Sequence, residues 1–418
     1  MKKSEYFSVI DVGTSKICVV IAKVDVDAKI EVLGVGQAES FGLKMGVVSD
    51  IYQTKKSIGE AITTAEREAG VKANDFFVSI SGDHIKSMNL DGSSTISNFS
   101  ESEIKKRHIK EVIENAKNKA GKKITDKNLK IIHAIPQSFH IDNESIQVEN
   151  PLGKYGCDLT GKVHIIFAKN SNMRDIGKCI ELAGYRVRDF IYSGLASGYC
   201  MLDDEQKKYG VILVDIGAGT TDICVYYDGS LFFSKSIAQG GIGITEVLAI
   251  GLNTKTRATE RLKVEKGDLS GRLNSTEVVK VVDINGEKQQ TIEIEKLSGI
   301  IEFKMKEILE NVYSCLFKED YYDVIKAGIV LTGGTSKMGG LKRFTKKMFN
   351  KFINLGKPDI ENKLSGAKKG RLKDSTYSTV VGLLCYAAEQ FSSPDSATTS
   401  GVQSDVWGKI KKFFKDFV

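Results

Sequence analysis

Two short segments of this 418-residue chain share one pattern: an apolar strand ending in aspartate, a glycine-containing turn with hydroxyl residues, and a second apolar strand. The first copy holds Asp11 and Gly13, and the second holds Asp215 and Gly217. When the copies are aligned on their aspartates, the apolar residues resume two positions later in the second copy, which predicts a longer second turn. This duplication restricts the chain to folds with two similar halves, each opening on a hairpin.

A third glycine cluster, at residues 328–336, follows an apolar strand and contains Gly333 and Gly334. Residues 52–70, 172–184 and 297–318 carry apolar side chains three and four positions apart, which predicts helices. Strands that alternate with helices, with glycine-rich turns at the strand ends, indicate an α/β fold.

Changes in composition predict a division of the chain into domains. Residues 84–165 combine an amphipathic helix with separate strands and predict an inserted α+β subdomain. The expected division is 1–83 and 166–195 as the first half, with 380–391 returning to it, 196–379 as the second half, with about 246–319 as its smaller subdomain, 392–404 as a flexible polar linker, and 405–418 as a separate element.

Charge and cysteine usage exclude several classes of protein. The net charge of +7, from 60 Lys and Arg against 53 Asp and Glu, is too small an excess to suggest a nucleic-acid-binding protein. The seven cysteines are scattered and form no CxxC pair, which argues against zinc or thioredoxin-type chemistry and suits a reducing cytoplasm. We identify no signal peptide and no run of apolar residues long enough to span a bilayer.

The paired turns have the chemistry of a polyphosphate site. Their small residues let backbone N–H groups approach phosphate oxygens, hydroxyls add donors, and Lys16 can neutralise charge. An aspartate at a strand end can hold Mg²⁺ through water. One such turn alone is usually a plain hairpin, but two in register with a Gly-Gly turn predict a bound nucleotide. The P-loop and the GxGxxG dinucleotide motif are absent.

The three clusters are similar to the phosphate-1, phosphate-2 and adenosine motifs of the actin-like ATPase superfamily, and residues 192–198 and 377–384 resemble its two connecting helices. His-Ala-Ile-Pro-Gln at 133–137, Asn-Pro-Leu-Gly at 150–153 and the segment 211–222 resemble the FtsA family of bacterial cell-division proteins. This resemblance covers nearly the whole chain. It implies an α/β, actin-like fold of two duplicated halves around a nucleotide cleft, with an inserted α+β subdomain and a C-terminal amphipathic helix.

The resemblance also implies a binding site for ATP and Mg²⁺ between the halves. Mg²⁺ is expected near Asp11 and Asp215, held through water. The nucleotide-binding residues implied are Gly13, Thr14, Ser15, Lys16, Asp215, Gly217, Gly219, Thr220, Thr221, Gly241, Glu260, Lys263, Gly333, Gly334 and Met338. No catalytic residue can be named, and we expect at most weak ATPase activity.

Partners follow from the same resemblance. The helix at 297–318, with Lys304, is expected to bind the C-terminal peptide of the tubulin-like division protein FtsZ. A solvated helix face is an equally good interpretation of Lys304 and Lys306. Copies of the chain are expected to polymerise into filaments, and the inserted subdomain to form contacts between them. Later division proteins are further expected partners.

The last fourteen residues predict a membrane-binding helix. On a helix, one arc of roughly 140° holds the apolar side chains and the lysines lie outside it. The apolar residues are Val406, Trp407, Ile410, Phe413, Phe414, Phe417 and Val418, and the lysines are Lys409, Lys411, Lys412 and Lys415. A helix of about 21 Å is too short to span a bilayer, so it would lie in the interface of an anionic membrane. Docking on the protein's own core is the alternative, and the lysines and polar linker argue against it.

These expectations together describe a scaffold on the cytoplasmic side of the inner membrane, at the division site, that anchors the FtsZ ring and helps to recruit later proteins. A sugar kinase of the same fold, a chaperone ATPase and a pilus-assembly relative are the alternatives. A kinase needs a catalytic aspartate beside a sugar pocket, and a chaperone needs a long substrate domain after the ATPase core. None of the three classes accounts for the tail.

Overall fold

The structure is a computed structural model, and it describes residues 6–25, 29–98, 100–142, 144–271, 277–317 and 321–391. The predicted linker 392–404 and the predicted membrane-binding helix 405–418 lie outside the described residues. Within the residues described, no helix is both long and apolar enough to cross a membrane.

The first half is built on a six-stranded sheet with the order β12-β6-β1-β2-β3-β20. Its strands are β1 (Phe7–Val12), β2 (Lys16–Val24), β3 (Ile30–Glu39), β6 (Asp75–Ile80), β12 (Arg186–Tyr192) and β20 (Leu364–Ser365). β1, β2 and β3 form an antiparallel meander, while β6 runs parallel to β1 and β12 parallel to β6. A two-stranded ribbon of β4 (Leu43–Lys44) and β5 (Val47–Val48) lies beyond β3 in the chain.

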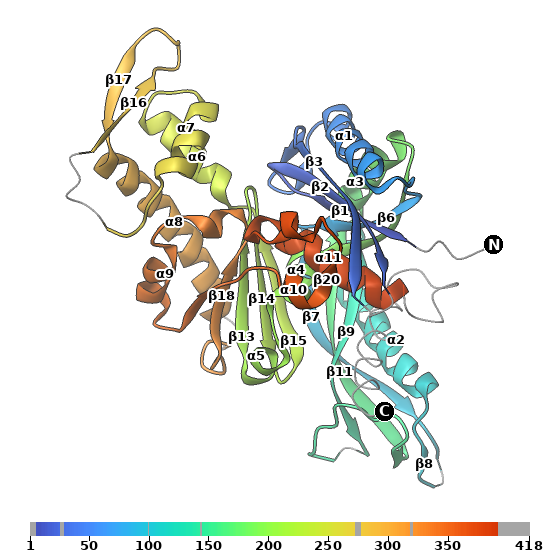
Figure 1. Cartoon of the computed structure of the whole chain (residues 1–418). Helices are drawn as coiled ribbons and strands as arrows, with labels where there is room; N and C mark the ends of the chain where they lie inside the picture. The colour runs from blue at the N-terminus through green and yellow to red at the C-terminus, as the bar shows by residue number, and fades with distance from the viewer. Residues whose placement is uncertain are drawn as a thin grey trace.

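The second half repeats this topology in a five-stranded sheet with the order β15-β14-β13-β18-β19. Its strands are β13 (Val211–Ile216), β14 (Thr221–Tyr227), β15 (Ser230–Ile237), β18 (Gly328–Thr332) and β19 (Ile353–Leu355). The meander β13-β14-β15 matches β1-β2-β3, and the parallel strands β18 and β19 match β6 and β12. The two halves thus share one strand order, which confirms the duplication predicted from the paired turns (Figure 1).

The predicted difference in turn length is wrong. Val12 pairs with Ile17 and Ile216 pairs with Thr221, so four residues connect the last pair in each hairpin. The second strand of the second hairpin begins with Thr221 and Asp222, both buried, before its apolar run starts. An alignment on apolar residues therefore slips by two positions, because the strand opens with polar side chains.

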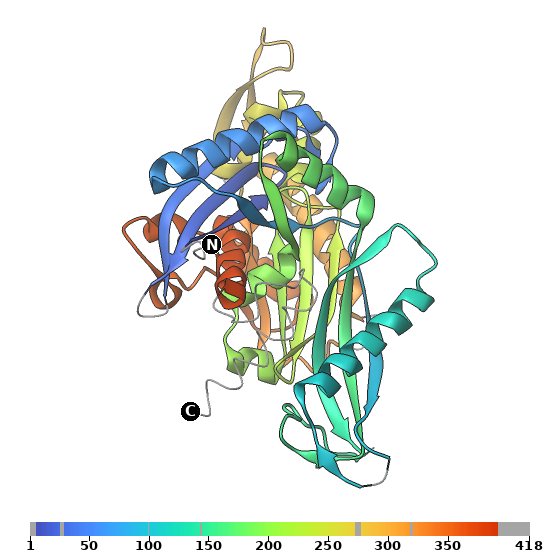
Figure 2. The same cartoon turned by 90° about the vertical axis from the view of Figure 1, so that its right-hand side faces the viewer.

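Helices cover both faces of the first sheet (Figure 2). One face carries α1 (Ile51–Ala69) and α3 (Asn170–Leu182), and the other carries α4 (Ser193–Met201) and α11 (Ser378–Phe391). α1 begins where the Asp50 carboxylate accepts from the backbone N–H groups of Tyr52 and Gln53, and it ends at Gly70 with φ +70°. α4 also contacts β13 and β14, so α4 and α11 lie at the junction of the halves.

The inserted subdomain extends away from the first half and consists of a sheet covered by one helix (Figure 1). Its strands are β7 (Lys86–Thr95), β9 (Leu129–Ile141) and β11 (Asp158–Lys169), with the short pair β8 (Ser102–Glu103) and β10 (Tyr155–Gly156). α2 (Lys106–Lys123) packs on β7 and β11, and its buried face places Ile109, Val112 and Ala116 in a core of this subdomain's own. The predicted inserted α+β subdomain is confirmed.

The second half also contains α5 (Asp204–Tyr209), α6 (Gly241–Gly251), α7 (Thr256–Lys266), β16 (Val278–Val282), β17 (Gln289–Glu293), α8 (Ile294–Phe317), η1 (Gly334–Lys337) and α9 (Leu341–Phe349). The other described elements are α10 (Ile360–Lys363), η2 (Lys369–Leu372) and η3 (Ser375–Tyr377). α10 contacts β20, and Ile360 and Leu372 lie in the core of the first sheet. α6 packs on α7 and α8, and the β16–β17 hairpin projects from this group at the upper left of Figure 1.

Candidate functional site

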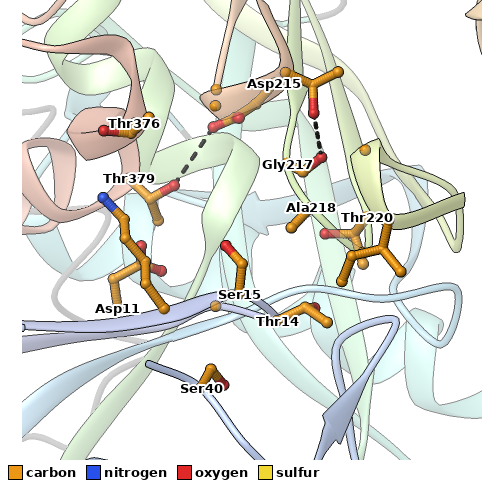
Figure 3. Close-up of a pocket in the computed structure, with 18 of the residues that line it drawn as sticks. Asp11, Thr14, Ser15, Ser40, Asp215, Gly217, Ala218, Thr220, Thr376 and Thr379 are labelled. Carbon is orange, nitrogen blue, oxygen red and sulfur yellow. Dashed lines mark hydrogen bonds between the residues drawn. The ribbon is translucent and has the colours of Figure 1, made fainter. Parts of the chain in front are cut away.

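A cavity of about 1060 Å³ lies between the halves, and all three glycine clusters line it. Figure 3 labels residues of the first two clusters around it. Drug-sized ligands occupy pockets of about 300–1,000 Å³, so the cavity has room for a nucleotide. The structure brings together nearly every predicted site residue in its lining: Asp11, Gly13, Thr14, Ser15, Lys16, Asp215, Gly217, Gly219, Thr220, Gly241, Glu260, Lys263, Gly333, Gly334 and Met338. Thr221 is the exception, because it is fully buried and donates its hydroxyl hydrogen to the Gln239 carbonyl at 2.9 Å.

The two phosphate-type turns have the same internal geometry and contact each other. Gly13 N–H donates to the Lys16 carbonyl at 3.1 Å, and Gly217 N–H donates to the Thr220 carbonyl at 2.9 Å. A Cβ at Gly219 would lie 2.4 Å from Thr14 Oγ1, so only glycine permits this approach. The turns therefore face the cavity from opposite halves, as the sequence predicted.

The third turn closes the same cavity behind Asp215. Gly333 has φ +87°, and a Cβ there would lie 2.3 Å from Asp215 Oδ1. Thr335, two residues on, donates to the Gly217 carbonyl at 2.9 Å and so joins this turn to the second phosphate-type turn. Gly334 is different, since a Cβ there would meet nothing closer than Thr376 Cγ2 at 3.4 Å.

Two buried carboxylates, Asp215 and Asp222, and the partly buried Asp11 line the cavity, and loss of contact with water raises the pKa of each. Ser79 donates to Asp11 at 2.8 Å and Ser197 donates to Asp215 at 2.6 Å, which offsets part of the rise. The pKa of Asp215 is raised to about 6, and that of Asp222 to about 7. Asp215 and Asp222 are directly paired across β13 and β14, so repulsion between their charges adds to the effect of burial on Asp222.

Lys16 is a cation in this acidic cavity. Its Nζ lies 3.5 Å from the centroid of the Tyr377 ring, a cation–π contact. Burial lowers the pKa of Lys16, and the carboxylate of Asp11 counteracts part of this. A phosphate placed between the two turns would offer the ammonium group a stronger partner than the ring.

Glu260 and Lys263 support the glycine turn before α6. Lys263 Nζ donates to the Gly241 carbonyl at 2.8 Å, to Thr245 Oγ1 at 2.8 Å and to Glu260 Oε2 at 2.7 Å. The side chain of Lys263 is 9% exposed and that of Glu260 is 47% exposed. Glu260 therefore presents an oxygen to solvent and the cavity, whereas Lys263 holds backbone in place.

Sequence reasoning missed the hydroxyl groups and the third acid of this cavity. Ser79 lies in β6 and Ser81 follows it, and both line the cavity. Thr379 on α11 donates to Asp215 (Figure 3), and so does Ser197 on α4, which is buried behind the lining. Both helices resemble the superfamily's connecting helices, but nothing in their spacing points to these hydroxyls. Asp222 closes the segment 211–222, and the strand register is what brings it opposite Asp215.

Among the residues described, no group of three or more His, Cys, Asp or Glu side chains could hold a metal ion. Mg²⁺ usually keeps several waters and takes one or two carboxylates plus substrate phosphates. Asp11 and Asp215 fit that mode, since each lies at a strand end and lines the cavity.

The structure places Lys304 on α8, where its ammonium group forms an ion pair within the same helix. Lys304 Nζ lies 2.9 Å from both carboxylate oxygens of Glu307, and the side chain is 18% exposed. Its neighbours differ, because Phe303 is 68% exposed and the Lys306 side chain is 60% exposed. Near Lys304, the exposed face of α8 therefore includes Phe303 and Lys306, whose Nζ lies 3.7 Å from Glu310, while Lys304 packs beside Gly243.

Known structures show which class of fold this is. The chain resembles the protein in the PilM–PilN type IV pilus biogenesis complex with a TM-score of 0.66 and 14% identity, covering 92% of this chain and 99% of that one. It resembles MreB 5 of Spiroplasma citri, solved with AMPPNP, with a TM-score of 0.51 and 12% identity over the full length of both chains. Two halves of one strand order around a shared cleft thus define the chain as a protein of the actin-like class.

Sequence comparison identifies the family within that class. The model of the cell division protein FtsA matches residues 212–382, and that of the SHS2 domain inserted in FtsA matches residues 82–167. The chain is 34% identical to the cell division protein FtsA of Pseudomonas aeruginosa over 393 residues, which are 94% of this chain and 91% of the relative. It is 30% identical to that of Escherichia coli over 411 residues, or 96% and 95%. The chain belongs to the FtsA family and is an actin-like bacterial cell-division protein.

The raised pKa of Asp222 predicts a stabilising substitution. The pKa of Asp222 is about 7 in the folded chain and 3.8 in an ordinary aspartate. Its protonated form therefore contributes stability at low pH that is lost as the pH rises from about 4 through 7. Asp222→Asn removes the buried charge, so at pH 8 without nucleotide we expect a gain in unfolding free energy on the order of 2 kcal/mol, shrinking as the pH falls to 5. Urea denaturation at both pH values measures this. The exposed Asp323→Asn is the control, and a loss of stability at pH 8 in Asp222→Asn would contradict the assignment.

Proposed function

We propose that this cell-division protein binds Mg-ATP in the cleft, forms filaments at the cytoplasmic face of the inner membrane, and tethers the FtsZ ring there through residues 405–418. The observation that carries the nucleotide part is the convergence of two aspartate-ended hairpins and the Gly333–Gly334 turn on one cavity. The likeness to MreB 5 of Spiroplasma citri, solved with ADP and with AMPPNP, supports a nucleotide in this place.

The residues of the cleft divide the work of holding a nucleotide. Backbone N–H groups of the two phosphate-type turns, with the hydroxyls of Thr14, Ser15 and Thr220, would bind phosphate oxygens. Asp11 and Asp215 would hold Mg²⁺ through water, and the ion would supply the positive charge that the three carboxylates of the cavity and a polyphosphate require. Glu260 would face the ribose. Any hydrolysis is expected to be slow, and no described side chain is assigned to it.

A pelleting assay tests the scaffold function as a whole. Anionic vesicles, Mg-ATP and purified FtsZ are mixed with the full chain or with a chain ending at residue 404. The full chain should carry FtsZ into the vesicle pellet, and the shortened chain should leave it in the supernatant. Electron microscopy of the same vesicles should show filaments of the chain. FtsZ that stays soluble with the full chain would contradict the tethering function, and vesicles without filaments would contradict polymerisation.

The exposed face of α8 gives a sharper test for the FtsZ C-terminal peptide. Lys306→Glu reverses an exposed charge, and combining it with Lys304→Glu also breaks the Lys304–Glu307 pair. We expect Lys306→Glu to weaken peptide binding about fivefold at low salt and to reduce its salt sensitivity, and the double substitution to weaken it further. Titration of labelled peptide measures both.

The matched control is Lys296→Glu, an exposed lysine ten residues earlier on the same helix. It makes the same change of charge and should leave the dissociation constant unchanged. Equal dissociation constants for the parent, Lys306→Glu and the double variant would place the peptide elsewhere.

A further inference from the structure

The inserted subdomain rests on the second half through polar contacts along β15. Asn89 donates to the Phe232 carbonyl at 2.9 Å, Gln137 to the Leu231 carbonyl at 2.8 Å, and Ser87 to the Ser234 carbonyl at 2.7 Å. The ring of His164 bridges Asn89 Oδ1 at 2.6 Å and Ser234 Oγ at 2.8 Å. We call these contacts of Ser87, Asn89, Gln137 and His164 with residues 231–234 the β15 seam. Ile135 and Leu231 share one apolar core beside the seam, so its hydrogen bonds can tighten or loosen while that packing is kept.

The same strand ends at the nucleotide cleft. Ser236, two residues beyond the seam, lies 3.0 Å from Ser81 Oγ, and its hydroxyl accepts from the Gly82 N–H at 3.1 Å. Ser81 and Gly82 stand between β6 and β7, where the chain leaves the first half for the inserted subdomain. Gly82 has φ +135°, a conformation that favours glycine. Ser81 and Gly82, where the chain enters the inserted subdomain and which we call its root, are therefore hydrogen-bonded to the end of β15 nearest the cleft.

Ser81 also lines the cavity and touches the second phosphate-type turn. Its hydroxyl donates to Asp222 Oδ1 at 2.7 Å and lies within donating distance of Thr220 Oγ1 at 3.1 Å. A serine carries a single hydroxyl hydrogen, so it serves one of these acceptors well at a time. In the structure the shorter bond goes to the carboxylate of Asp222.

A phosphate in the cleft changes this choice. Thr220 would give its own hydrogen to a phosphate oxygen, and a hydroxyl that donates becomes a better acceptor. The Ser81 hydrogen can then pass from Asp222 to Thr220, because the Asp222 carboxylate keeps its hydrogen bonds with Ser236 and Tyr192. The root of the inserted subdomain becomes bonded to a turn that the phosphate has ordered, and this order extends through Ser236 to the β15 seam.

We propose that Ser81 is a nucleotide-sensing residue. When a nucleotide binds in the cleft, Ser81 exchanges its hydrogen-bond partner from Asp222 to Thr220, and this exchange affects the β15 seam, where the inserted subdomain contacts the second half. This rests on the proposed binding of Mg-ATP and assigns a regulation to that site. The bound nucleotide tightens the seam, and by reciprocity an intact seam favours the bound nucleotide.

Hydrogen–deuterium exchange of the full chain, with and without saturating Mg-ATP, tests the proposal. In the parent, amides of residues 86–95, 133–141 and 230–237 should exchange about fivefold more slowly with nucleotide. In Ser81→Ala, saturated according to its own titration, that slowing should be lost in the seam. Ser94→Ala is the matched control, because Ser94 is a buried serine of the same subdomain whose hydroxyl donates to Glu111 instead. It should keep the slowing.

A second variant tests the reciprocal effect. Asn89 does not line the cavity, yet Asn89→Ala should weaken Mg-ATP binding about fivefold by calorimetry, because it opens the seam. Its control is Asn115→Ala, which removes an asparagine that donates to the Ser93 carbonyl inside the inserted subdomain and should not change affinity.

The outcomes separate this proposal from the proposed function. A parent chain that binds Mg-ATP without any slowing in the seam overturns the sensing function of Ser81 and leaves nucleotide binding intact. Full slowing in Ser81→Ala, or unchanged affinity in Asn89→Ala, overturns it as well. A parent that does not bind Mg-ATP overturns the proposed function first, and the sensing function with it.

Discussion

Saturating Mg-ATP is expected to raise the melting temperature of the parent chain by several degrees and to leave that of Gly334→Arg unchanged. A ligand that binds only the folded state stabilises it by about 4 kcal/mol at a thousand times its dissociation constant. Gly334 lines the cavity, its backbone is outside the left-handed region, and a Cβ there meets nothing closer than 3.4 Å. Arginine can therefore be accommodated at this position, and its side chain would fill the space where the nucleotide is expected.

The neighbouring glycine shows why this position is chosen. Gly333 has φ +87°, and its Cβ would collide with Asp215 Oδ1, so a substitution there would damage the fold and the site together. Gly370→Arg is the matched control for Gly334→Arg. A Cβ at Gly370 would have no neighbouring atom within 4 Å, and Gly370 does not line the cavity, so this variant should melt and respond to Mg-ATP like the parent. A parent chain that shows no shift, or a Gly334→Arg chain that shows the full shift, would contradict nucleotide binding in this cleft.

The architecture was predictable because local sequence patterns determine most of its elements. Each half opens on a strand, a glycine turn and a strand, and the turn chemistry at Asp11 and Asp215 recurs at equivalent places in the two sheets. Amphipathic spacing located α1, α3 and α8 to within a few residues of their ends. The inserted subdomain was visible as a change of pattern at 84–165, and the structure shows it with a core of its own.

The register of the second hairpin was not predictable, and the site depends on it. Matching by apolar residues made Ile223 the equivalent of Ile17. Strand pairing instead makes Thr221 the equivalent of Ile17, because Ile17 pairs with Val12 and Thr221 pairs with Ile216. The pairing brings Asp222 opposite Asp215, while the first half has Cys18 opposite Asp11. The third carboxylate is thus a product of register, which is fixed by the whole sheet rather than by the turn alone.

Lys304 shows a second feature that could not be predicted from the sequence. Helical periodicity predicted α8, but it does not say which lysine on the helix is free to bind a partner. Lys304 is committed to Glu307, three residues on, and packs beside Gly243. That contact depends on how α6 and α8 are packed, which the sequence of either helix does not contain. The exposed pair of Phe303 and Lys306 becomes evident only from the packed structure.

The tail carries the second large effect, because Phe414→Glu is expected to abolish binding to anionic vesicles. Each apolar side chain of the predicted helix contributes about 1.5–3 kcal/mol when fully buried, and each lysine about 1 kcal/mol near anionic lipid. A glutamate at position 414 places a charge in the middle of the apolar arc, and removes a phenylalanine at the same time. Lys412→Glu changes only the polar face, so it should weaken binding without abolishing it.

Trp407 reports this binding without a label, because it is the single tryptophan of the chain and stands on the predicted apolar face. Anionic vesicles should shift its emission to the blue, neutral vesicles less so, and high salt should reverse part of the shift by screening the lysines. Phe414→Glu should show no shift and Lys412→Glu a reduced one. Phe391→Glu is not a suitable control, because Phe391 packs on Phe7; Lys373→Glu changes an exposed lysine of the folded part and should behave like the parent. An emission that is already blue in buffer and indifferent to lipid would mean that the tail docks on its own protein, and tethering by residues 405–418 would then be wrong.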